Sequence, residues 1–160
     1  LFRSAHLPLD AHPRYGNNAQ LCRSLGIGRS KPAFVYHGET IGFVGSLPKP
    51  ISFPAFCERV GRAVGQTVRS ADFGRKTVRT VGVVSGGAAD MADQAEALGA
   101  DAFLTGEPSL QGYILAENLG LNIVFAGHYA TETFGVRALA KLIASRLRLP
   151  AEFIDFNIPF

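Results

Sequence analysis

The chain has few cysteines, lacks long apolar runs and has little net charge, and each of these features excludes some classes of protein. Its two cysteines, Cys22 and Cys57, are far apart, which indicates free, partly buried thiols rather than a disulfide framework. No stretch approaches the roughly eighteen consecutive apolar residues of a membrane-spanning helix, and residues 1–10 lack the layout of a signal peptide. We therefore expect a cytoplasmic protein. The chain also begins without a methionine, so we expect the natural protein to be longer at this end.

The charge balance favours a solvated surface over a nucleic-acid interface. The chain has 16 Lys and Arg residues against 13 Asp and Glu, which gives a formal net charge of +3. The basic residues are scattered, and the small clusters within 69–79 and 141–148 do not alternate with aromatics in a nucleic-acid-binding pattern. We therefore expect a small-molecule partner rather than a nucleic acid. With 160 residues, 47% of them apolar, the chain has the size of one domain with a sizeable core.

Apolar periodicity and turn residues predict short elements in the first half of the chain. Residues 33–36 and 40–45 flank a polar turn, as the two strands of a β-hairpin do. Ser52 before Pro54 is typical of a helix N-terminus, and Asn17 or Asn18 could cap an earlier helix. The other predicted features are an extended segment over 1–10, a linker over 47–50 and one short strand within 65–77.

Strands and helices alternate in the second half of the chain. The β-branched run 78–84 predicts a buried strand, and further strands are predicted at 102–105, 122–126 and 153–156. Helices are predicted between them, over 88–98, 109–118 and 131–147. This alternation predicts an α/β fold: a layered, mostly parallel sheet with covering helices plus the β-hairpin, in a single domain region of residues 1–160. Five phenylalanines are expected in the core: Phe2, Phe43, Phe103, Phe125 and Phe153.

Polar residues directly follow three of the predicted strands. They are Ser85-Gly86-Gly87, Thr105-Gly106-Glu107 and Gly127-His128. Because the carboxyl ends of parallel strands share one edge of the sheet, these groups should converge at that edge, where active groups of α/β proteins lie.

His128 and Glu132 lie one helical turn apart in the run GHYATETFG. At this spacing an imidazole and a carboxylate project from one face of a helix and can bind one metal ion, or one ion each of a pair. A surface pair, or a histidine that caps its own helix, would show the same spacing. The position directly after a buried strand favours the metal-ligand interpretation.

Asp10, His6 and Glu107 are further candidates for the same site. Asp10 closely follows His6 and the stiff Pro8, although a lone Asp in a loop is more often a turn or cap residue. Glu107 ends a strand, where it could be a general base, a hydrogen-bond partner of a ligand histidine, or an acid of a first helical turn. The residues alone leave these roles open.

The turn at Gly86 and Gly87 also has two interpretations. Free N–H groups at a helix N-terminus can hold an anion such as a phosphate. The run lacks the lysine of a Walker loop and the full dinucleotide fingerprint, and tight-turn geometry explains its glycines at least as well.

Three runs, taken together, resemble a known family. They are SAHLPLDAHPRYGNNAQL over 4–21, VSGGAADM with GADAFLTGE in the middle, and FAGHYATETFGVRAL over 125–139. In this order they are similar to the Nif-three-like dinuclear metal-centre proteins, many of which carry the label type-two GTP cyclohydrolase I. The resemblance covers essentially the whole chain.

The resemblance implies an α/β fold, a toroidal hexamer and two divalent metal ions in each complete site. The family's aspartate matches Asp10, and its histidine and glutamate match His128 and Glu132, so these three are the implied metal ligands. By the same resemblance, His6 is an auxiliary group near the site, and Glu107 supports a ligand or acts as a base; these two are the tentative catalytic residues. Mixed N and O ligands would suit Zn, Fe, Mn or Co.

One feature of the family has no counterpart in this sequence. Family members supply two further ligands from an adjacent histidine pair in an N-terminal lobe, and the chain contains no adjacent histidines. We therefore expect the chain to be the C-terminal part of the family's sequence, with most of the ligand-bearing lobe absent.

The resemblance implies a metal-dependent hydrolase with metal-bound water as the nucleophile. Type-two GTP cyclohydrolase activity on a nucleotide is its specific form. The alternative is a non-enzymatic metal-binding or protein-interaction scaffold in a ring-shaped homo-oligomer. A third interpretation is an anion-binding α/β module in which the metal is incidental.

Overall fold

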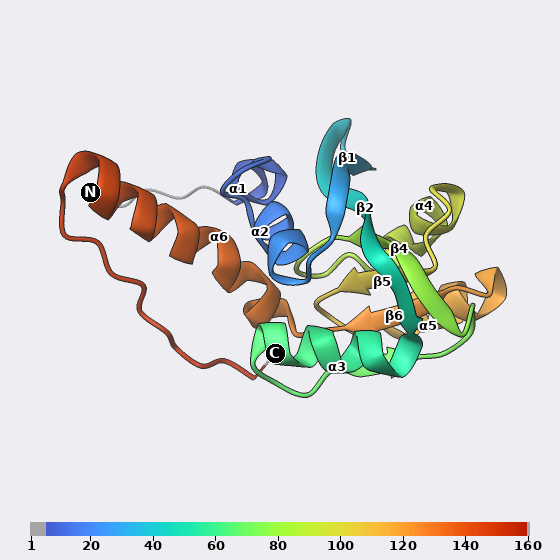
Figure 1. Ribbon diagram of the computed structural model, residues 1–160. Helices are drawn as coiled ribbons and strands as arrows, with labels where there is room; N and C mark the ends of the chain where they lie inside the picture. Colours follow the sequence, from blue (N-terminus) through green and yellow to red (C-terminus); the bar gives the residue numbers. More distant parts are fainter. Residues whose placement is uncertain (1–5, 160) are drawn as a thin grey trace.

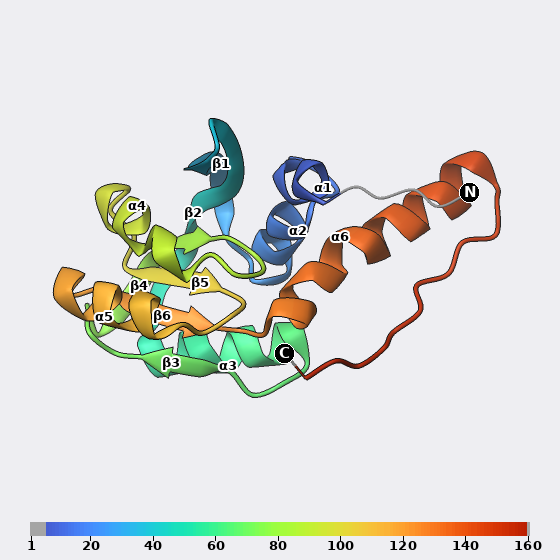
Figure 2. The same ribbon diagram turned by 180° about the vertical axis from the view of Figure 1, so that it is seen from behind.

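The computed structural model describes residues 6–159, and a six-stranded sheet with the order β1-β2-β4-β5-β6-β3 lies at its centre (Figures 1 and 2). β5 pairs in parallel with β4 and with β6, and the other three pairings are antiparallel. The strands are β1 (Gly28–Tyr36), β2 (Glu39–Ser52), β3 (Arg69–Ala71), β4 (Thr77–Val83), β5 (Ala102–Thr105) and β6 (Asn122–Phe125).

The sheet is therefore mixed, and the prediction of a mostly parallel sheet is wrong, whereas the α/β class is confirmed. The predicted hairpin forms, but it extends the sheet at the β4 edge through an antiparallel pairing of β2. The short strand predicted within 65–77 is β3, which pairs antiparallel with β6 at the other edge. Antiparallel edge strands thus flank a parallel centre, as in many mixed sheets.

Helices cover both faces of the sheet and divide the core in two. One apolar cluster lies under α2 (Asn17–Ser24) and α3 (Phe53–Val64), and the other lies under α4 (Ala92–Ala97) and α5 (Leu110–Leu119). α3 lies in front of the sheet in Figure 1, and α5 lies in front of it in Figure 2. The remaining helical elements are α1 (Leu7–Ala11), a 3-10 turn (Ala89–Met91), α6 (His128–Leu142) and a π-helical turn (Ile143–Leu147). Within residues 6–159, no helix is long and apolar enough to cross a membrane.

Local sequence sets the ends of several helices. Ser52 accepts a hydrogen bond from the Ala55 N–H at 3.4 Å, and Pro54 lies in the first turn of α3, where a missing N–H costs nothing. Both features were expected from the sequence. The predicted cap of α2 is wrong, because Gly16 is its N-cap and Asn17 lies inside the helix.

Prolines account for two further differences between the predicted and the observed elements. Residues 7–11 form α1 instead of an extended segment, with Pro8 in the first turn, and residues 1–5 lie outside the described part of the chain. The predicted linker 47–50 lies within β2, whose pairing shifts register between Ser46 and Ile51. The prolines of this stretch occupy the irregular part of the pairing, where a strand tolerates a residue without an N–H donor.

The C-terminal segment differs most from its prediction. α6 begins at His128 rather than at Thr131, and residues 148–159 return from its far end towards α3 without the predicted strand 153–156 (Figure 1). β3 already occupies the outer edge of β6, so that edge is closed to another strand. Phe153 is only half-buried and lies outside the core, with its ring centre 4.0 Å from the Arg137 guanidinium carbon. Of the other phenylalanines predicted for the core, three are buried and one lies outside the described residues: Phe43, Phe103 and Phe125, and then Phe2.

Candidate metal centre

Three loops meet at the carboxyl ends of β4, β5 and β6, as the sequence predicts. The Gly86 carbonyl oxygen accepts hydrogen bonds from the N–H groups of Gly106 and Glu107, both at 2.9 Å. The Gly127 N–H donates to the Gly106 carbonyl oxygen at 2.9 Å. These bonds hold the loops side by side, so the functional side chains start from a fixed backbone.

The close approach of the loops requires a glycine at position 106. A β-carbon there would lie 2.7 Å from the Gly86 carbonyl oxygen and 2.7 Å from Thr131 Oγ1. Both distances are shorter than a normal contact with carbon, so the β5 loop and α6 leave no room for a side chain between them.

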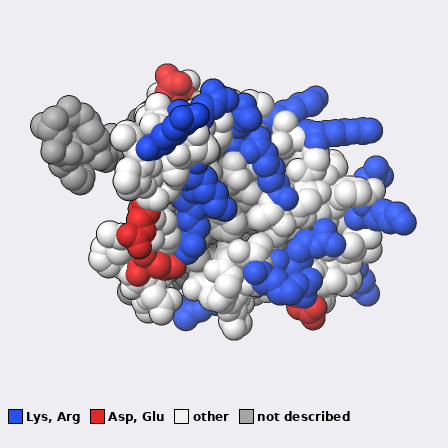
Figure 3. Space-filling model, turned by 60° about the vertical axis from the view of Figure 1, so that its left-hand side comes forward, with Lys and Arg blue, Asp and Glu red and all other residues white. Residues whose placement is uncertain are grey.

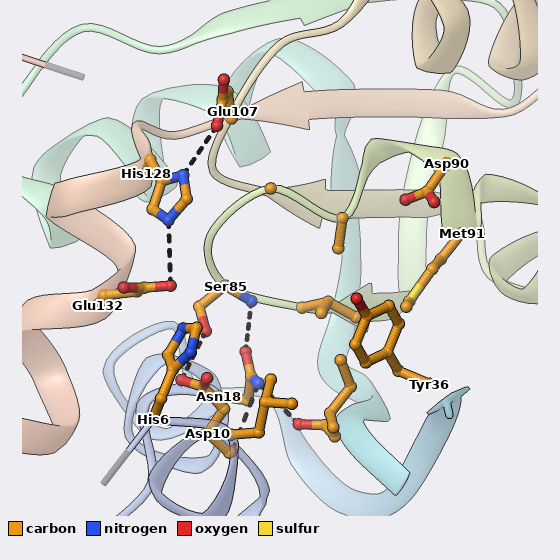
Figure 4. A pocket seen from close by; sticks show the side chains of 15 residues that line it. His6, Asp10, Asn18, Tyr36, Ser85, Asp90, Met91, Glu107, His128 and Glu132 are labelled. Atoms are coloured by element: carbon orange, nitrogen blue, oxygen red, sulfur yellow. Dashed lines mark hydrogen bonds and ion pairs between the residues drawn. The ribbon is translucent and has the colours of Figure 1, made fainter. Parts of the chain in front are cut away.

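The His128 ring lies between two carboxylates (Figure 4). Its Nδ1 is 2.8 Å from Glu107 Oε2, and its Nε2 is 3.3 Å from Glu132 Oε1. A neutral ring that donates its Nδ1 proton to Glu107 keeps the lone pair of Nε2 on the side of Glu132. Carboxylates orient metal-ligating histidines in this way in many proteins.

Asp10 and His6 reach the same place from the N-terminal part of the chain. Asp10 lies in α1 and is only 5% exposed. One donor atom from each of His6, Asp10 and Glu132 lies within 4.8 Å of the other two. The structure thus brings together two of the implied ligands, Asp10 and Glu132, with His6, which the resemblance placed only near the site. His128, the third implied ligand, joins this group through its contact with Glu132.

Two buried asparagines support this group. Asn17 donates from Nδ2 to Asp10 Oδ1 at 2.7 Å, and its Oδ1 accepts from the Gly135 N–H at 2.6 Å. Asn18 accepts from the Ser85 N–H at 2.6 Å through its Oδ1. Sequence reasoning assigned these residues to capping and missed this role. The available signal is that two polar residues of low helix propensity lie side by side within a short helix.

Burial and neighbouring charges shift the pKa of Glu132. Burial raises the pKa of Glu132, the neighbouring His128 opposes this shift, and the nearby charge of Asp10 raises the pKa further. A divalent cation would favour the charged form of both carboxylates. The donor set of two imidazoles and two carboxylates, without sulfur, fits Zn, Fe, Mn or Co.

Several backbone donors of the glycine turn after β4 are already used within the protein. Three N–H groups at this turn already donate to side-chain oxygens of the protein: those of Ser85, Gly86 and Ala88. Donors that are satisfied internally are not available to a phosphate. The structure therefore supports tight-turn geometry as the reason for Gly86, which has a positive φ, whereas anion binding at the turn stays a prediction.

A cavity of about 490 Å³ opens onto the candidate ligands (Figure 4). The five residues that the sequence singled out all line it: His6, Asp10, Glu107, His128 and Glu132. Three separate segments of the chain contribute them, so the site depends on the complete fold.

Fold and site together define a class, namely α/β proteins with a carboxylate and imidazole cluster at the carboxyl edge of their parallel strands. Within this class, the chain belongs to the Duf34/NIF3 (NGG1p interacting factor 3) family, whose profile matches residues 2–158. The resemblance of the three sequence runs is thereby confirmed.

Curated relatives carry a common name. A Halobacterium salinarum protein named "GTP cyclohydrolase 1 type 2 homolog" is 44% identical over 155 residues, which cover 95% of this chain and 61% of the relative. A Deinococcus radiodurans protein of the same name is 39% identical over 153 residues, which cover 96% of this chain and 58% of the relative. The chain thus spans about three-fifths of the length of these curated relatives.

Solved structures share the fold. The protein ybgI, described as of unknown function, matches with a TM-score of 0.89 and 36% identity, over 97% of this chain and 61% of its own. A crystal structure from Thermus thermophilus matches with a TM-score of 0.84 and 35% identity, over 98% of this chain and 61% of its own. The mixed six-stranded sheet with its covering helices is therefore shared with the matched part of these structures.

Proposed function

We propose that the chain forms part of the metal site of a metal-dependent hydrolase. The observation that carries the proposal is the grouping of His6, Asp10 and Glu132 within 4.8 Å, with His128 against Glu132. A solvated surface pair would not require a buried Asp10 held by Asn17. Buried carboxylates are costly unless a cation or a proton compensates their charge.

Four side chains would hold the divalent ions. His6, Asp10 and Glu132 would contribute as one group, and His128 would contribute from beside Glu132. Zn, Fe, Mn and Co are the candidate metals. Such an ion, when bound, lowers the pKa of water towards neutrality and so makes a nucleophile available.

Glu107 is placed both to orient a ligand and to move a proton. Its Oε2 is 2.8 Å from His128 Nδ1 and would accept a hydrogen bond from an Nδ1–H group, which directs Nε2 towards Glu132. The Glu107 side chain is about half exposed and lines the cavity, so it can also accept a proton from a group bound there. A conservative change to Gln would keep the hydrogen-bond acceptor and remove the basic carboxylate.

The relatives indicate the first substrate to assay. Their name, "GTP cyclohydrolase 1 type 2 homolog", leads us to propose hydrolysis of a carbon–nitrogen bond, with GTP as the starting test compound. The chain spans only about three-fifths of those relatives, so we propose this activity for the completed site of a homo-oligomer. The hexamer implied by the sequence resemblance is the assembly to test first.

Metal content is the first measurement. The purified chain would be stripped with chelator, reloaded with Zn and analysed by inductively coupled plasma mass spectrometry. We expect His128→Ala and Glu132→Gln to lose Zn relative to the unchanged chain. His37→Ala and Glu58→Gln are matched controls, because both residues are exposed and lie outside the cavity. Zn content that is the same in all four variants would contradict the proposed site.

Turnover is the second measurement. Metal-dependent hydrolysis of GTP should be lost in Glu132→Gln and restored by none of the candidate metals. Glu107→Gln should retain most of its Zn and lose turnover, because the substitution removes the proton acceptor. A Zn-loaded assembly that hydrolyses neither GTP nor cyclic amides would contradict the hydrolase proposal.

A binding scaffold is the second candidate, and one surface feature favours it. α5 exposes Leu110, Tyr113 and Ile114, which is unusual for a helix that otherwise packs on the sheet. Exposed apolar side chains grouped on one helix are typical of protein contacts. Bound metal without turnover, together with loss of assembly in Leu110→Ser, would favour this candidate.

A further inference from the structure

The cavity has a second end, away from the candidate ligands. Tyr36, Asp90 and Met91 lie across the cavity from His128 and Glu132 (Figure 4). They belong to β1 and to the 3-10 turn before α4, which contribute no candidate ligand. In a cavity of about 490 Å³, this end leaves space for an organic group beside a bound ion.

Part of the cavity wall is apolar. Ile41, Val84, Ala88 and Met91 line the cavity, belong to one apolar cluster, and are each at most 6% exposed. The Tyr36 ring is partly exposed and also lines the cavity. A buried apolar wall with one aromatic ring favours a planar, weakly hydrated group over a strongly hydrated one.

The charged groups that line the cavity, apart from histidine, are all carboxylates: Asp10, Asp90, Glu107 and Glu132. Among residues 6–159, neither Lys nor Arg lines it, and the same holds for an adjoining cavity of about 280 Å³ that shares Asp90 and Glu107. Lys and Arg side chains instead spread over the outer surface, as Figure 3 shows for the side from which α6 projects. In the described part of the chain, Glu107 pairs with His128, whereas Asp90 forms no ion pair.

Three backbone donors of the turn after β4 are not available to compensate for this negative charge. The N–H groups of Ser85, Gly86 and Ala88 already donate to side chains of the protein. At Gly87, the position of a β-carbon would lie only 3.2 Å from Glu107 Oε2, so the surroundings of the turn are acidic. An anion placed there would meet the Glu107 carboxylate, which repels it.

We infer that this end of the cavity binds an uncharged or cationic planar group with N–H donors, such as an amide or an amidine, with Asp90 as the residue that selects its charge. Tyr36 and Met91 provide the surfaces against which the group packs. A triphosphate would have to lie outside this cavity. The inference rests on the proposed function and deepens it, because it names the chemical class of the group held beside the metal.

Probes of one shape and different charge provide the test. The affinities of benzamidine, benzamide and benzoate would be measured by ligand-observed NMR titration, on the metal-free chain for all three and on the Zn-loaded chain for the first two. We expect benzamidine to bind about fivefold more tightly than benzamide, as one solvent-exposed charge contact would give, and benzoate to bind most weakly.

Substitutions test whether Asp90 causes the preference for benzamidine. Asp90→Asn should abolish the advantage of benzamidine and leave benzamide binding unchanged. Asp93→Asn is the matched control, because Asp93 is an exposed carboxylate on α4 that does not line the cavity. Tyr36→Ala should weaken benzamidine and benzamide equally, because the ring contributes surface and not charge.

Several results would overturn the inference: no measurable benzamidine binding, benzoate binding as tight as benzamidine binding, or a preference that survives Asp90→Asn. Metal content measured on the same samples separates this outcome from that of the proposed function. A chain that binds no Zn but keeps the preference that depends on Asp90 contradicts the proposed function alone. A chain that binds Zn without this preference contradicts the inference alone.

Discussion

Asn17 links α1 to α6 at the site, and Asn17→Ala tests how the site is held together. The Asn17 side chain contacts Asp10 in α1 and Gly135 in α6, the latter 118 positions away in the sequence. The substitution removes a donor at 2.7 Å from Asp10 Oδ1 and an acceptor at 2.6 Å from the Gly135 N–H. Both partners are buried, so water cannot replace the lost groups freely.

The expected loss of stability follows from the two polar groups that lose a hydrogen-bond partner in Asn17→Ala. Asp10 loses the shorter of two side-chain hydrogen bonds and keeps the one from Ser85 Oγ at 3.3 Å. A hydrogen bond to a buried charged group contributes roughly 1.5–3 kcal/mol. The Gly135 N–H lies inside a helix, where a backbone carbonyl oxygen of the same helix can accept its hydrogen bond. Loss of the Asn17 acceptor should therefore lower the free energy of unfolding by only about 1 kcal/mol. We therefore expect Asn17→Ala to lower the free energy of unfolding by roughly 2–4 kcal/mol.

Urea unfolding of the metal-free chain, followed by circular dichroism, measures this change. Asn118→Ala is the matched control, because Asn118 is exposed on α5 and its loss should change the free energy of unfolding by less than about 0.5 kcal/mol. If Asn17→Ala were no less stable than Asn118→Ala, Asn17 would not hold Asp10 in place, and the account of the buried support would be wrong.

Three further predictions concern the loops, the thiols and the C-terminal segment. Gly106→Ala should destabilise the chain by more than about 1 kcal/mol and reduce its Zn content, because the new methyl group would overlap the Gly86 carbonyl oxygen; an unfolding midpoint equal to that of the unchanged chain would contradict this. Burial raises the pKa of Cys22 to about 12 and also raises that of Cys57. Both thiols should therefore react more slowly with Ellman's reagent at pH 8 in the native chain than in the urea-unfolded chain, and Cys22 should react most slowly. The free energy of unfolding should fall as the pH rises above the ordinary pKa of the thiols, because only the unfolded chain then readily loses their protons. Equal native and unfolded reaction rates would refute this. Hydrogen bonds from the Asn157 N–H and the Tyr129 hydroxyl lower the pKa of Asp155, so its contacts should persist near neutral pH and be lost as the pH falls below the ordinary value of about 4; NMR shifts of Phe153 would follow this loss, and Asp155→Asn should resemble the acidified chain at neutral pH.

The part of the site that could be predicted from the sequence follows from local patterns of residues. The i, i+4 spacing of His128 and Glu132 is a property of one helix, and it survives although α6 begins three residues earlier than predicted. The convergence of the strand-end loops follows from the parallel pairing of β4, β5 and β6, which the alternation of strands and helices indicates. The position of Asp10 came only from the family resemblance, because nothing local distinguishes it from a turn residue.

Long-range pairing is what the sequence did not reveal. The antiparallel pairing of Phe43 in β2 with Val83 in β4 makes the hairpin part of the main sheet. Neither turn residues nor apolar periodicity in the sequence indicate this pairing. The polar pair at 17 and 18 has the composition of a cap, and only tertiary packing gives these asparagines their partners, which are Asp10 and Gly135 for Asn17 and Ile41 and Ser85 for Asn18. Segment 153–156 has the composition of a strand, but the edge it would need is already occupied by β3.

The joining of α1 and α6 at one cluster has a consequence for folding and survival of the chain. His6 and Asp10 meet Glu132 only when most of the polypeptide closes into one long loop, and closure of a long loop has an entropic cost. A bound ion would act as a reversible cross-link between the α1 segment and α6, and at a free concentration one hundred times its Kd it would add about 2.7 kcal/mol to the stability. Supply of the metal would then set how often the chain opens and how long it resists a protease, independently of any reaction at the site.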